Sequence, residues 1–369
     1  MKSANQNYNQ LKAVINKLHR GVLATLSGFS LNRAKLLLRY LWYNKIKKEV
    51  IPQVMTVGVT YSCQCRCVHC SSGVPELKQN LKEKEMTTWQ IKDLIDQATL
   101  IGIPRITFFG GEPLLRKDIF ELIRYANFKG VITRINTNGL ALNEKVVVKL
   151  KDAGLTHCDV SIDDSNPEVH DKLRGFPGLF ERVIKGIGLL KKHKMLCQIV
   201  TYASKRNVTD GLERTIELGR KLRVTSVSIV FPMATGCWFE SFDELLNKEE
   251  RKMVRDLADA NFVHIEIPTS KDRCNVVKQA SLYVSPEGNA TPCPFIPWSF
   301  GNIKSNKLGK LAEAFYSDFN YDYQGDCLMN DVCTRDFLCK TIDKVLNRPN
   351  RPKKPKEPKE PKEPNKPNK

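Results

Sequence analysis

The most constraining feature of the chain is an alternation, from residue 54 onward, of short β-branched apolar runs with longer stretches of helical periodicity. Strands are expected at 54–61, 105–109, 131–136, 158–162, 196–202 and 224–231. Helices are expected at 87–101, 118–128, 143–153, 180–192, 211–222 and 248–259. Parallel strands need crossover connections, which are nearly always right-handed, so this succession indicates a parallel sheet. We predict an α/β fold, a partial (βα)6 barrel like a TIM barrel, with its chemistry at the carboxyl ends of the strands.

The remaining chain divides around this barrel, which we place at residues 51–261. Residues 1–50 form a basic, amphipathic N-terminal segment. Residues 262–343 contain several cysteines and many turn residues, so we expect a small domain held by metal. Residues 344–369 alternate proline with charged residues and cannot bury a core, which predicts a disordered, extended tail.

The net charge of +19 is concentrated at the two ends of the chain. Residues 1–50 contribute +9 and residues 344–369 contribute +7, which leaves +3 for the folded middle. A nucleic-acid-binding groove needs its basic residues in the folded part of the protein. The distribution therefore argues against dedicated nucleic-acid binding.

The sequence also indicates a compartment. The longest apolar stretch, residues 21–43, is interrupted by Arg33, Lys35 and Arg39, so no transmembrane helix is expected. The first thirty residues lack the apolar region of a signal peptide, and we expect a cytoplasmic protein. Twelve cysteines in that compartment are more often metal ligands or catalysts than disulfides.

The N-terminal segment contains one clear helical pattern. Between residues 31 and 48, Leu31, Ala34, Leu38, Leu41 and Trp42 recur at helical spacing among lysines and arginines. One interpretation of this basic helix is peripheral contact with a membrane surface or a partner. The interpretation we favour is a leading helix that packs on the main domain.

Four cysteines follow the first expected strand within eight residues, and three of them, Cys63, Cys67 and Cys70, have the spacing CxxxCxxC. A closed iron–sulfur cubane takes four cysteines, so a three-cysteine loop leaves one iron open to a substrate or cofactor. A zinc knuckle that uses all four thiolates is the alternative. In the iron–sulfur interpretation, Cys65 points away from the loop and His69 packs against the cluster without binding it.

The second expected strand ends in Gly110, Gly111, Glu112 and Pro113. A glycine pair lets the backbone approach a ligand closely, and a carboxylate there can bind the ammonium group of a ligand. Without the cysteine loop, an ordinary strand-to-loop turn would be the simpler interpretation.

Together the two motifs resemble those of the radical S-adenosylmethionine (SAM) superfamily, and the resemblance covers about residues 54–235. It implies a catalytic [4Fe–4S] cluster on Cys63, Cys67 and Cys70 whose open iron binds S-adenosyl-L-methionine, with residues 110–113 as further cofactor-binding residues. It also implies an external reductant such as flavodoxin or ferredoxin. The cofactor would be cleaved to methionine and a 5′-deoxyadenosyl radical, which abstracts hydrogen from a substrate.

Three further segments resemble the same superfamily. Asn138, in a Thr-Asn-Gly turn, resembles a position near the cofactor ribose. Ser161, in an SxD segment, and Arg174, in an HDxxRG segment, are candidates for binding the cofactor carboxylate. A strand-end cap for Ser161 and a surface position for Arg174 are the simpler alternatives.

The last five cysteines, Cys274, Cys293, Cys327, Cys333 and Cys339, resemble the SPASM and twitch extensions of this superfamily. The first two flank a glycine with the spacing of those extensions, which bind auxiliary [4Fe–4S] clusters. The full SPASM cysteine pattern is absent, so the resemblance implies one auxiliary cluster. Zinc in this region is the alternative.

Several functional classes remain to be weighed. SPASM-like proteins commonly modify peptides or proteins, so the resemblance implies a peptide or protein maturase acting on a peptide or other small molecule. Modification of a cofactor or a tetrapyrrole precursor is the alternative among enzymes. A non-catalytic iron–sulfur or zinc scaffold is the competing class.

No P-loop or HExxH segment is present in the sequence, which argues against a nucleoside-triphosphate-binding protein and a zinc protease. Cys158 and Cys197 lie in expected strands and should be small core residues.

Overall fold

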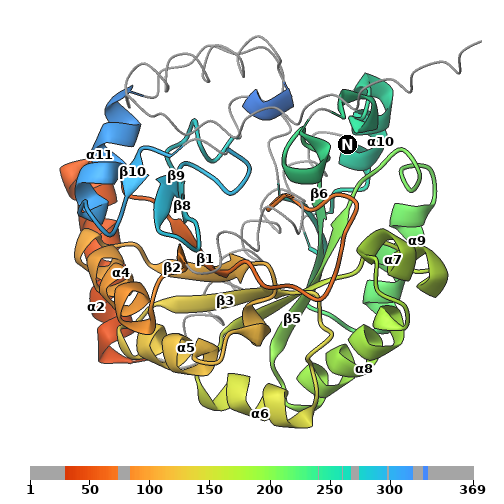
Figure 1. Ribbon diagram of the computed structural model, residues 1–369, viewed down its shortest axis with the longest axis horizontal. Coiled ribbons are helices and arrows are strands. Elements are labelled where there is room, and N and C mark those ends of the chain that lie inside the picture. The colour runs from red at the N-terminus through yellow and green to blue at the C-terminus, as the bar shows by residue number, and fades with distance from the viewer. Residues whose placement is uncertain are drawn as a thin grey trace, which may run out of the picture.

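The computed structural model describes residues 30–73, 84–239, 241–259, 261–266, 274–296, 299–318 and 327–330. Cys333, Cys339 and the tail at 344–369 lie outside these residues, so the expectations for them stay predictions. Figure 1 shows a curved sheet whose outer side is covered by helices.

The central strands lie where the sequence predicts them, with small differences at their ends. They are β1 (Val54–Thr60), β2 (Arg105–Gly110), β3 (Ile132–Thr137), β4 (His157–Ser161), β5 (Leu196–Tyr202) and β6 (Ser226–Val230). Each strand pairs in parallel with the next one along the chain, and β7 (Val263–Ile265) continues the series beside β6. The predicted α/β partial barrel is confirmed.

The helices between the strands also follow the sequence pattern. They are α4 (Thr88–Ile101), α5 (Ile119–Phe128), α6 (Glu144–Asp152), α8 (Leu179–Lys192), α9 (Gly211–Lys221) and α10 (Lys248–Asp256). Short helical turns lie at η3 (Pro113–Leu115), η4 (Gly236–Trp238), η5 (Phe242–Glu244) and η7 (Leu328–Asn330). Apolar side chains of the strands pack against the helices, and Cys158 and Cys197 are buried in this core, as predicted.

Among the helices of the barrel, α7 (Pro167–Arg174) was not predicted. Its sequence is short and mostly polar, so it shows little apolar periodicity. It begins because the Asn166 side chain accepts hydrogen bonds from two amides of its first turn and Pro167 occupies an early helical position. It ends at Gly175, which has the left-handed φ of 61° that favours glycine.

The chain beyond residue 262 extends the same sheet at both edges. While β7 joins one edge, β8 (Ser281–Val284) pairs in parallel with β1 at the other, followed by antiparallel β9 (Asn289–Thr291) and β10 (Gly301–Asn302). The helix α11 (Leu308–Asp318) begins with the Leu308 amide donating to Gln97 of α4, 2.8 Å away. The sheet therefore does not stop at residue 262, where we placed a domain boundary.

The N-terminal helix consists of α2 (Leu31–Leu41) and a π-helical turn, η1 (Trp42–Lys47). The Ser30 side chain caps it, and its inner face buries Arg33 and Leu36 against the barrel. This is the packing that we favoured from the sequence. Within the part of the chain that the structure describes, no helix combines the length and apolarity needed to span a bilayer.

Candidate functional site

The loop after β1 carries Cys63, Cys67 and Cys70 at the carboxyl end of the sheet, and all three are partly buried. No two cysteines of the described residues form a disulfide. The loop lies against Asn138 and Arg174, both expected from the sequence to belong to the site. Side chains that are far apart in the sequence thus meet around the cysteines.

The unpredicted helix α7 supports one side of the loop. The Arg66 amide donates to the Arg174 carbonyl at 2.9 Å, and the Val68 amide donates to the Leu173 carbonyl at 3.1 Å. Gly175 follows directly, and a Cβ there would lie 2.8 Å from the carbonyl oxygen of Arg66. The end of α7 therefore fixes the main chain between Cys63 and Cys70.

A second support comes from the segment after β6. The Cys237 amide donates to the Cys70 carbonyl at 2.9 Å. Gly236 has a φ of 59°, and a Cβ at this position would lie only 2.0 Å from the same carbonyl oxygen. Gly236 and the Cys237 backbone were not expected from the sequence as part of the site, because only the folded chain brings them to Cys70.

The glycine pair at the end of β2 contacts the beginning of the cysteine loop. The Gly111 amide donates to the Thr60 carbonyl at 2.7 Å, and the Glu112 amide donates to the Ser62 carbonyl at 2.8 Å. A Cβ on Gly110 would lie 2.3 Å from the Thr60 oxygen. The close approach that these glycines allow is to the chain's own loop, and their contact with a cofactor stays a prediction, as does that of Pro113.

Glu112 is fully buried between β2 and β3. Its Oε1 accepts hydrogen bonds from Thr137 Oγ1 at 2.8 Å and the Leu114 amide at 3.1 Å, and its Oε2 accepts one from the Asn138 amide at 2.7 Å. Burial raises the pKa of this carboxyl to about 7, although the hydrogen bonds act in the opposite direction. The sequence did not predict this enclosure of the carboxyl group by its own chain, and its contact with a ligand's ammonium group stays a prediction.

Asn138 connects the β3 turn to the cysteine loop. Its Nδ2 lies 3.8 Å from Cys63 Sγ and donates to Gln64 Oε1 at 3.2 Å. The Glu112 carboxyl group fixes its main chain. The sequence-based placement of Asn138 at the site is thus matched by its contacts, while its contact with a ribose stays a prediction.

Arg174 is held by Asp163, two residues after Ser161 at the end of β4. Arg174 Nη2 lies 2.9 Å from Asp163 Oδ1, and Nη1 lies 3.8 Å from Cys67 Sγ. The side chain is mostly buried, so the surface position that was the simpler alternative is wrong. Ser161 is partly exposed at the strand end, and its role toward a cofactor carboxylate stays a prediction.

An aromatic group that the sequence did not predict surrounds His69. The His69 ring stacks on Tyr202 at 4.7 Å between centroids, and Trp238 meets both rings edge-on. His69 Nε2 lies 3.4 Å from Asp163 Oδ2. Burial lowers the pKa of His69, with Asp163 acting in the opposite direction. Tyr202 at the end of β5 could have been noticed, since it occupies the strand end at which barrels place their chemistry.

Cys65 does not point away from the loop, contrary to our expectation. It is buried, and its thiol hydrogen-bonds with both Cys63 and Cys67, which raises its own pKa. The hydrogen bond from Cys65 is in turn the main cause that lowers the pKa of Cys67 to about 6.

The donor set of the loop fits an iron–sulfur cluster. Three thiols follow one another on a short loop, and an amide and a guanidinium group lie at 3.8 Å from two of the sulfurs, as expected around an anionic cluster. A single zinc ion needs ligand atoms at about 2.3 Å from one point. Among the described residues, no three His, Cys, Asp or Glu side chains converge in this way. The cysteines of a cubane bind different irons and stand further apart.

Three of the five C-terminal cysteines lie in the described residues. Cys274 is buried, and Cys293 and Cys327 are partly buried. Burial raises the pKa of Cys327 to about 12, and the charge of Cys274 contributes. Burial and the charge of Cys327 likewise raise the pKa of Cys293. A shared metal site for these cysteines stays a prediction.

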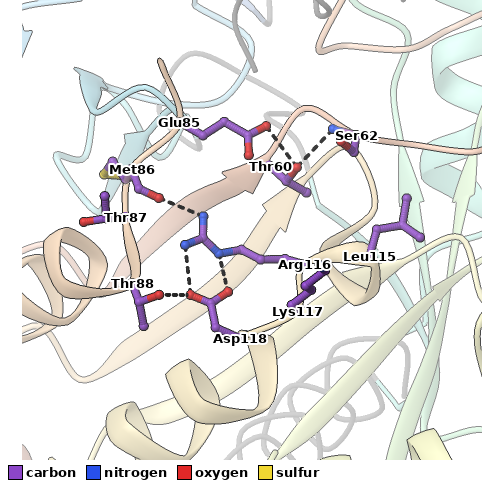
Figure 2. Close-up of a pocket in the computed structure, with 10 residues that line it drawn as sticks. All are labelled: Thr60, Ser62, Glu85, Met86, Thr87, Thr88, Leu115, Arg116, Lys117 and Asp118. Carbon is purple, nitrogen blue, oxygen red and sulfur yellow. Dashed lines mark hydrogen bonds and ion pairs between the residues drawn. The ribbon is translucent and has the colours of Figure 1, made fainter. Parts of the chain in front are cut away.

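A pocket of about 520 Å³ lies beside the base of the loop, between β1 and α5 (Figure 2). Arg116 crosses it, and its guanidinium binds Asp118 and donates to the carbonyls of Val59 and Met86. Glu85 accepts hydrogen bonds from Thr60 Oγ1 and the Tyr61 amide. These contacts brace the strand end from which the cysteine loop departs.

Comparison with known proteins agrees with this site. The family model described as the radical SAM superfamily matches residues 57–219. The chain belongs to this superfamily, whose enzymes use a [4Fe–4S] cluster and SAM, and it is itself a radical SAM enzyme.

Within the superfamily, the chain is similar to enzymes that are named for a particular reaction. It is 31% identical over 295 residues to an AdoMet-dependent heme synthase of Methanosarcina barkeri, covering 71% of this chain and 82% of the relative. It is 26% identical over 313 residues to an AdoMet-dependent heme synthase of Oleidesulfovibrio alaskensis, covering 74% and 80%. An Fe-coproporphyrin III synthase of M. barkeri is 31% identical over 245 residues, covering 66% of this chain and 59% of the relative.

Solved structures with this fold include peptide-bound enzymes. Streptococcus suis SuiB bound to the precursor peptide SuiA matches with a TM-score of 0.59 at 15% identity, over 79% of this chain and 72% of SuiB. The enzyme anSMEcpe, bound to AdoMet and a peptide, matches with a TM-score of 0.58 at 15% identity, over 80% and 99%. At this identity the likeness shows the fold alone. The expected peptide maturase is not supported by the curated relatives above, which are heme and coproporphyrin synthases.

Proposed function

We propose that this radical SAM enzyme modifies a side chain of an iron-porphyrin-type tetrapyrrole, the alternative that the sequence analysis placed second. The observation that carries the proposal is the 31% identity to a heme synthase over 295 residues, well beyond the stretch matched by the superfamily model. Substrate recognition in such barrels depends on segments outside the shared cofactor motifs. Similarity that extends through those segments therefore favours a related substrate.

The inner face of the sheet carries polar and charged side chains. Arg134 of β3 binds Asp159 of β4 through two contacts of 2.8 and 2.9 Å, on the face opposite to the helices. Gln198 accepts from Ser226 on the next strands, and Ser228 donates to Glu266. Closed TIM barrels fill this space mainly with branched aliphatic side chains. The polar inner face is therefore suited to a substrate that carries polar groups.

The residues of the site are proposed to divide the work. Cys63, Cys67 and Cys70 hold the cluster, which together with SAM supplies the electron and the hydrogen-abstracting chemistry. Arg174 and Asn138 donate toward the cysteine sulfurs and orient the loop. The partly buried rings of His69, Tyr202 and Trp238 exclude water from the space next to the cysteine loop.

The partners are proposed from the needs of this chemistry. Radical SAM enzymes require a reductant, and we propose a small donor such as flavodoxin or ferredoxin. A cytoplasmic location stays a proposal. Membrane contact through the basic N-terminal helix also stays a proposal. This helix lies at the amino ends of the strands, whereas the cysteine loop lies at their carboxyl ends.

Anaerobic reconstitution tests the function. The protein would be incubated with SAM, dithionite and iron coproporphyrin III, and in parallel with peptide mixtures, and 5′-deoxyadenosine and substrate mass would be measured. We expect 5′-deoxyadenosine together with a mass change in the tetrapyrrole. A variant with Cys63, Cys67 and Cys70 all replaced by Ala is the control and should give neither.

The possible outcomes test the enzyme class and the substrate separately. If 5′-deoxyadenosine forms while the tetrapyrrole stays unchanged and a peptide loses hydrogen, the substrate is wrong and the enzyme class stands. If no 5′-deoxyadenosine forms under any condition, the protein is a scaffold with an inactive cluster.

A further inference from the structure

The outer side of the N-terminal helix exposes a row of large apolar side chains. Leu31, Leu38, Trp42 and Ile46 are 69%, 66%, 54% and 62% exposed. They are seven, four and four residues apart, which is one or two helical turns, so they form one stripe along α2 and η1. The inner side of the same helix is already used, because Leu36 lies in the core of the barrel. The helix therefore has two apolar sides, and among the residues that the structure describes only the inner one packs on the barrel.

Two neighbouring helices enlarge this stripe. Arg39 donates to the carbonyl of Leu100 at the end of α4, and the Leu100 side chain is 69% exposed. Asn32 donates to the carbonyl of Phe128 at the end of α5, and the Phe128 side chain is 67% exposed. We call Leu31, Leu38, Trp42, Ile46, Leu100 and Phe128 the apolar patch. A patch of this kind on a folded protein marks a contact surface.

Basic side chains border the patch. The exposed residues Lys35, Arg39, Lys45, Lys47 and Lys48 lie on the same helix and just after it, and Glu49 is the only acidic residue between 31 and 50. Two copies of this surface would bring like charges together, which disfavours self-association. Apolar side chains with tryptophan among them and lysines at the margin match the boundary of an anionic bilayer.

We propose that the apolar patch and its basic border dock the enzyme on an anionic membrane surface. The helix packs on Gly102 and Gly130, which directly precede β2 and β3 at the amino ends of the strands. The cysteine loop lies at the carboxyl ends. Docking by this surface therefore leaves the site open to its substrate and its reductant.

Co-sedimentation of the full protein with vesicles tests the proposal. Vesicles of phosphatidylcholine mixed with phosphatidylglycerol in equal parts would be compared with vesicles of phosphatidylcholine alone. We expect binding to the anionic vesicles that weakens with added salt. The double variant Leu38→Glu and Trp42→Glu should lose nearly all binding, and Lys45→Glu should lower the affinity by about fivefold or more.

The matched control is Trp89→Glu. Trp89 is 74% exposed in the first turn of α4, at the opposite end of that helix from Leu100. It should bind vesicles like the unchanged protein, and circular dichroism should show that all variants keep their fold. Absence of vesicle binding by the unchanged protein overturns the proposal. So does a stable dimer, seen by sedimentation, that the Leu38 and Trp42 changes dissociate.

Discussion

Asp163 holds the guanidinium of Arg174 directly beside Cys67, with Oδ1 2.9 Å from Nη2 and Cys67 Sγ 3.8 Å from Nη1. Burial alone would raise the pKa of Asp163, but Arg174 and two neighbouring histidines lower it to about 2, so the carboxylate is charged. The same arginine provides the carbonyl that fixes the Arg66 amide in the cysteine loop. One ion pair thus connects the end of β4 to the proposed cluster ligands.

Replacing Asp163 with Asn should damage the cluster site as well as stability. Arg174 would be left buried without its carboxylate, and breaking such a pair typically costs about 3–5 kcal/mol. A shift of the loop by about 1 Å can slow a reaction about a hundredfold. We expect a loss of bound iron and of SAM cleavage, measured by iron analysis and 5′-deoxyadenosine formation.

Asp159→Asn is the matched control for this change. Asp159 is also buried and binds an arginine, Arg134, but it lies away from the cysteine loop. It should lose comparable stability in urea and keep its iron. Equal iron loss in both variants would show that Asp163 acts only through overall stability.

Gly236→Ala should specifically displace Cys70. Its added Cβ would lie 2.0 Å from the Cys70 carbonyl oxygen, so the loop must move. Gly178 is the control, because it has a comparable φ of 74° and nothing within 4 Å of an added Cβ. Both variants should lose about 1–2 kcal/mol from the left-handed conformation. Only Gly236→Ala should lose SAM cleavage, and equal cleavage in the two would refute a role for this contact.

The contrast between α4 and α7 shows why the sequence predicts some elements and not others. The α4 helix has a Thr87–Gln90 capping box, a buried apolar stripe and a left-handed Gly102 at its end, all of them local signals. The α7 helix also has a capping Asn166 and a left-handed Gly175, but it buries only His170 and so has no apolar stripe. A helix with a single buried side chain leaves no apolar periodicity, so the sequence pattern did not predict it.

The same distinction holds for the site. The spacing of Cys63, Cys67 and Cys70 is a local property, so the sequence identified the loop. The enclosure of Glu112 by Thr137 and Asn138 depends on how β2 and β3 pair, so the sequence analysis did not predict these hydrogen bonds.

Glu112 should make stability depend on pH. Its pKa is raised by burial from an ordinary value of 4.5 to about 7, so the folded state binds the proton more tightly than the unfolded state. Stability is then greatest below about pH 4.5 and decreases as the pH rises through about 7, by about 3 kcal/mol from this group. Urea unfolding of Glu112→Gln should lack this decrease. Identical pH dependence in both proteins would show that Glu112 does not titrate in this range.

Replacing Cys65 distinguishes an iron–sulfur cluster held by three thiolates from a zinc knuckle held by four. Only the outer three cysteines have the spacing of the superfamily loop, so Cys65→Ala should keep most SAM cleavage. Replacing Cys63, Cys67 and Cys70 together with Ala should abolish it. The measurement is 5′-deoxyadenosine formed per protein after anaerobic reconstitution. If Cys65→Ala is as inactive as the triple variant, the assignment of ligands is wrong.

The C-terminal cysteines should hold a second cluster, bound by Cys274, Cys293 and two of Cys327, Cys333 and Cys339. The reconstituted protein would then contain about eight irons, and the triple variant of the cysteine loop would keep about four. Replacing Cys274 and Cys293 should remove the other four and abolish turnover of the true substrate, while SAM cleavage continues. Cys158→Ala and Cys197→Ala are controls in the barrel core, which should lose stability and no iron. About four irons in the unchanged protein, with zinc lost from the Cys274 and Cys293 variant, would replace the auxiliary cluster with a zinc site.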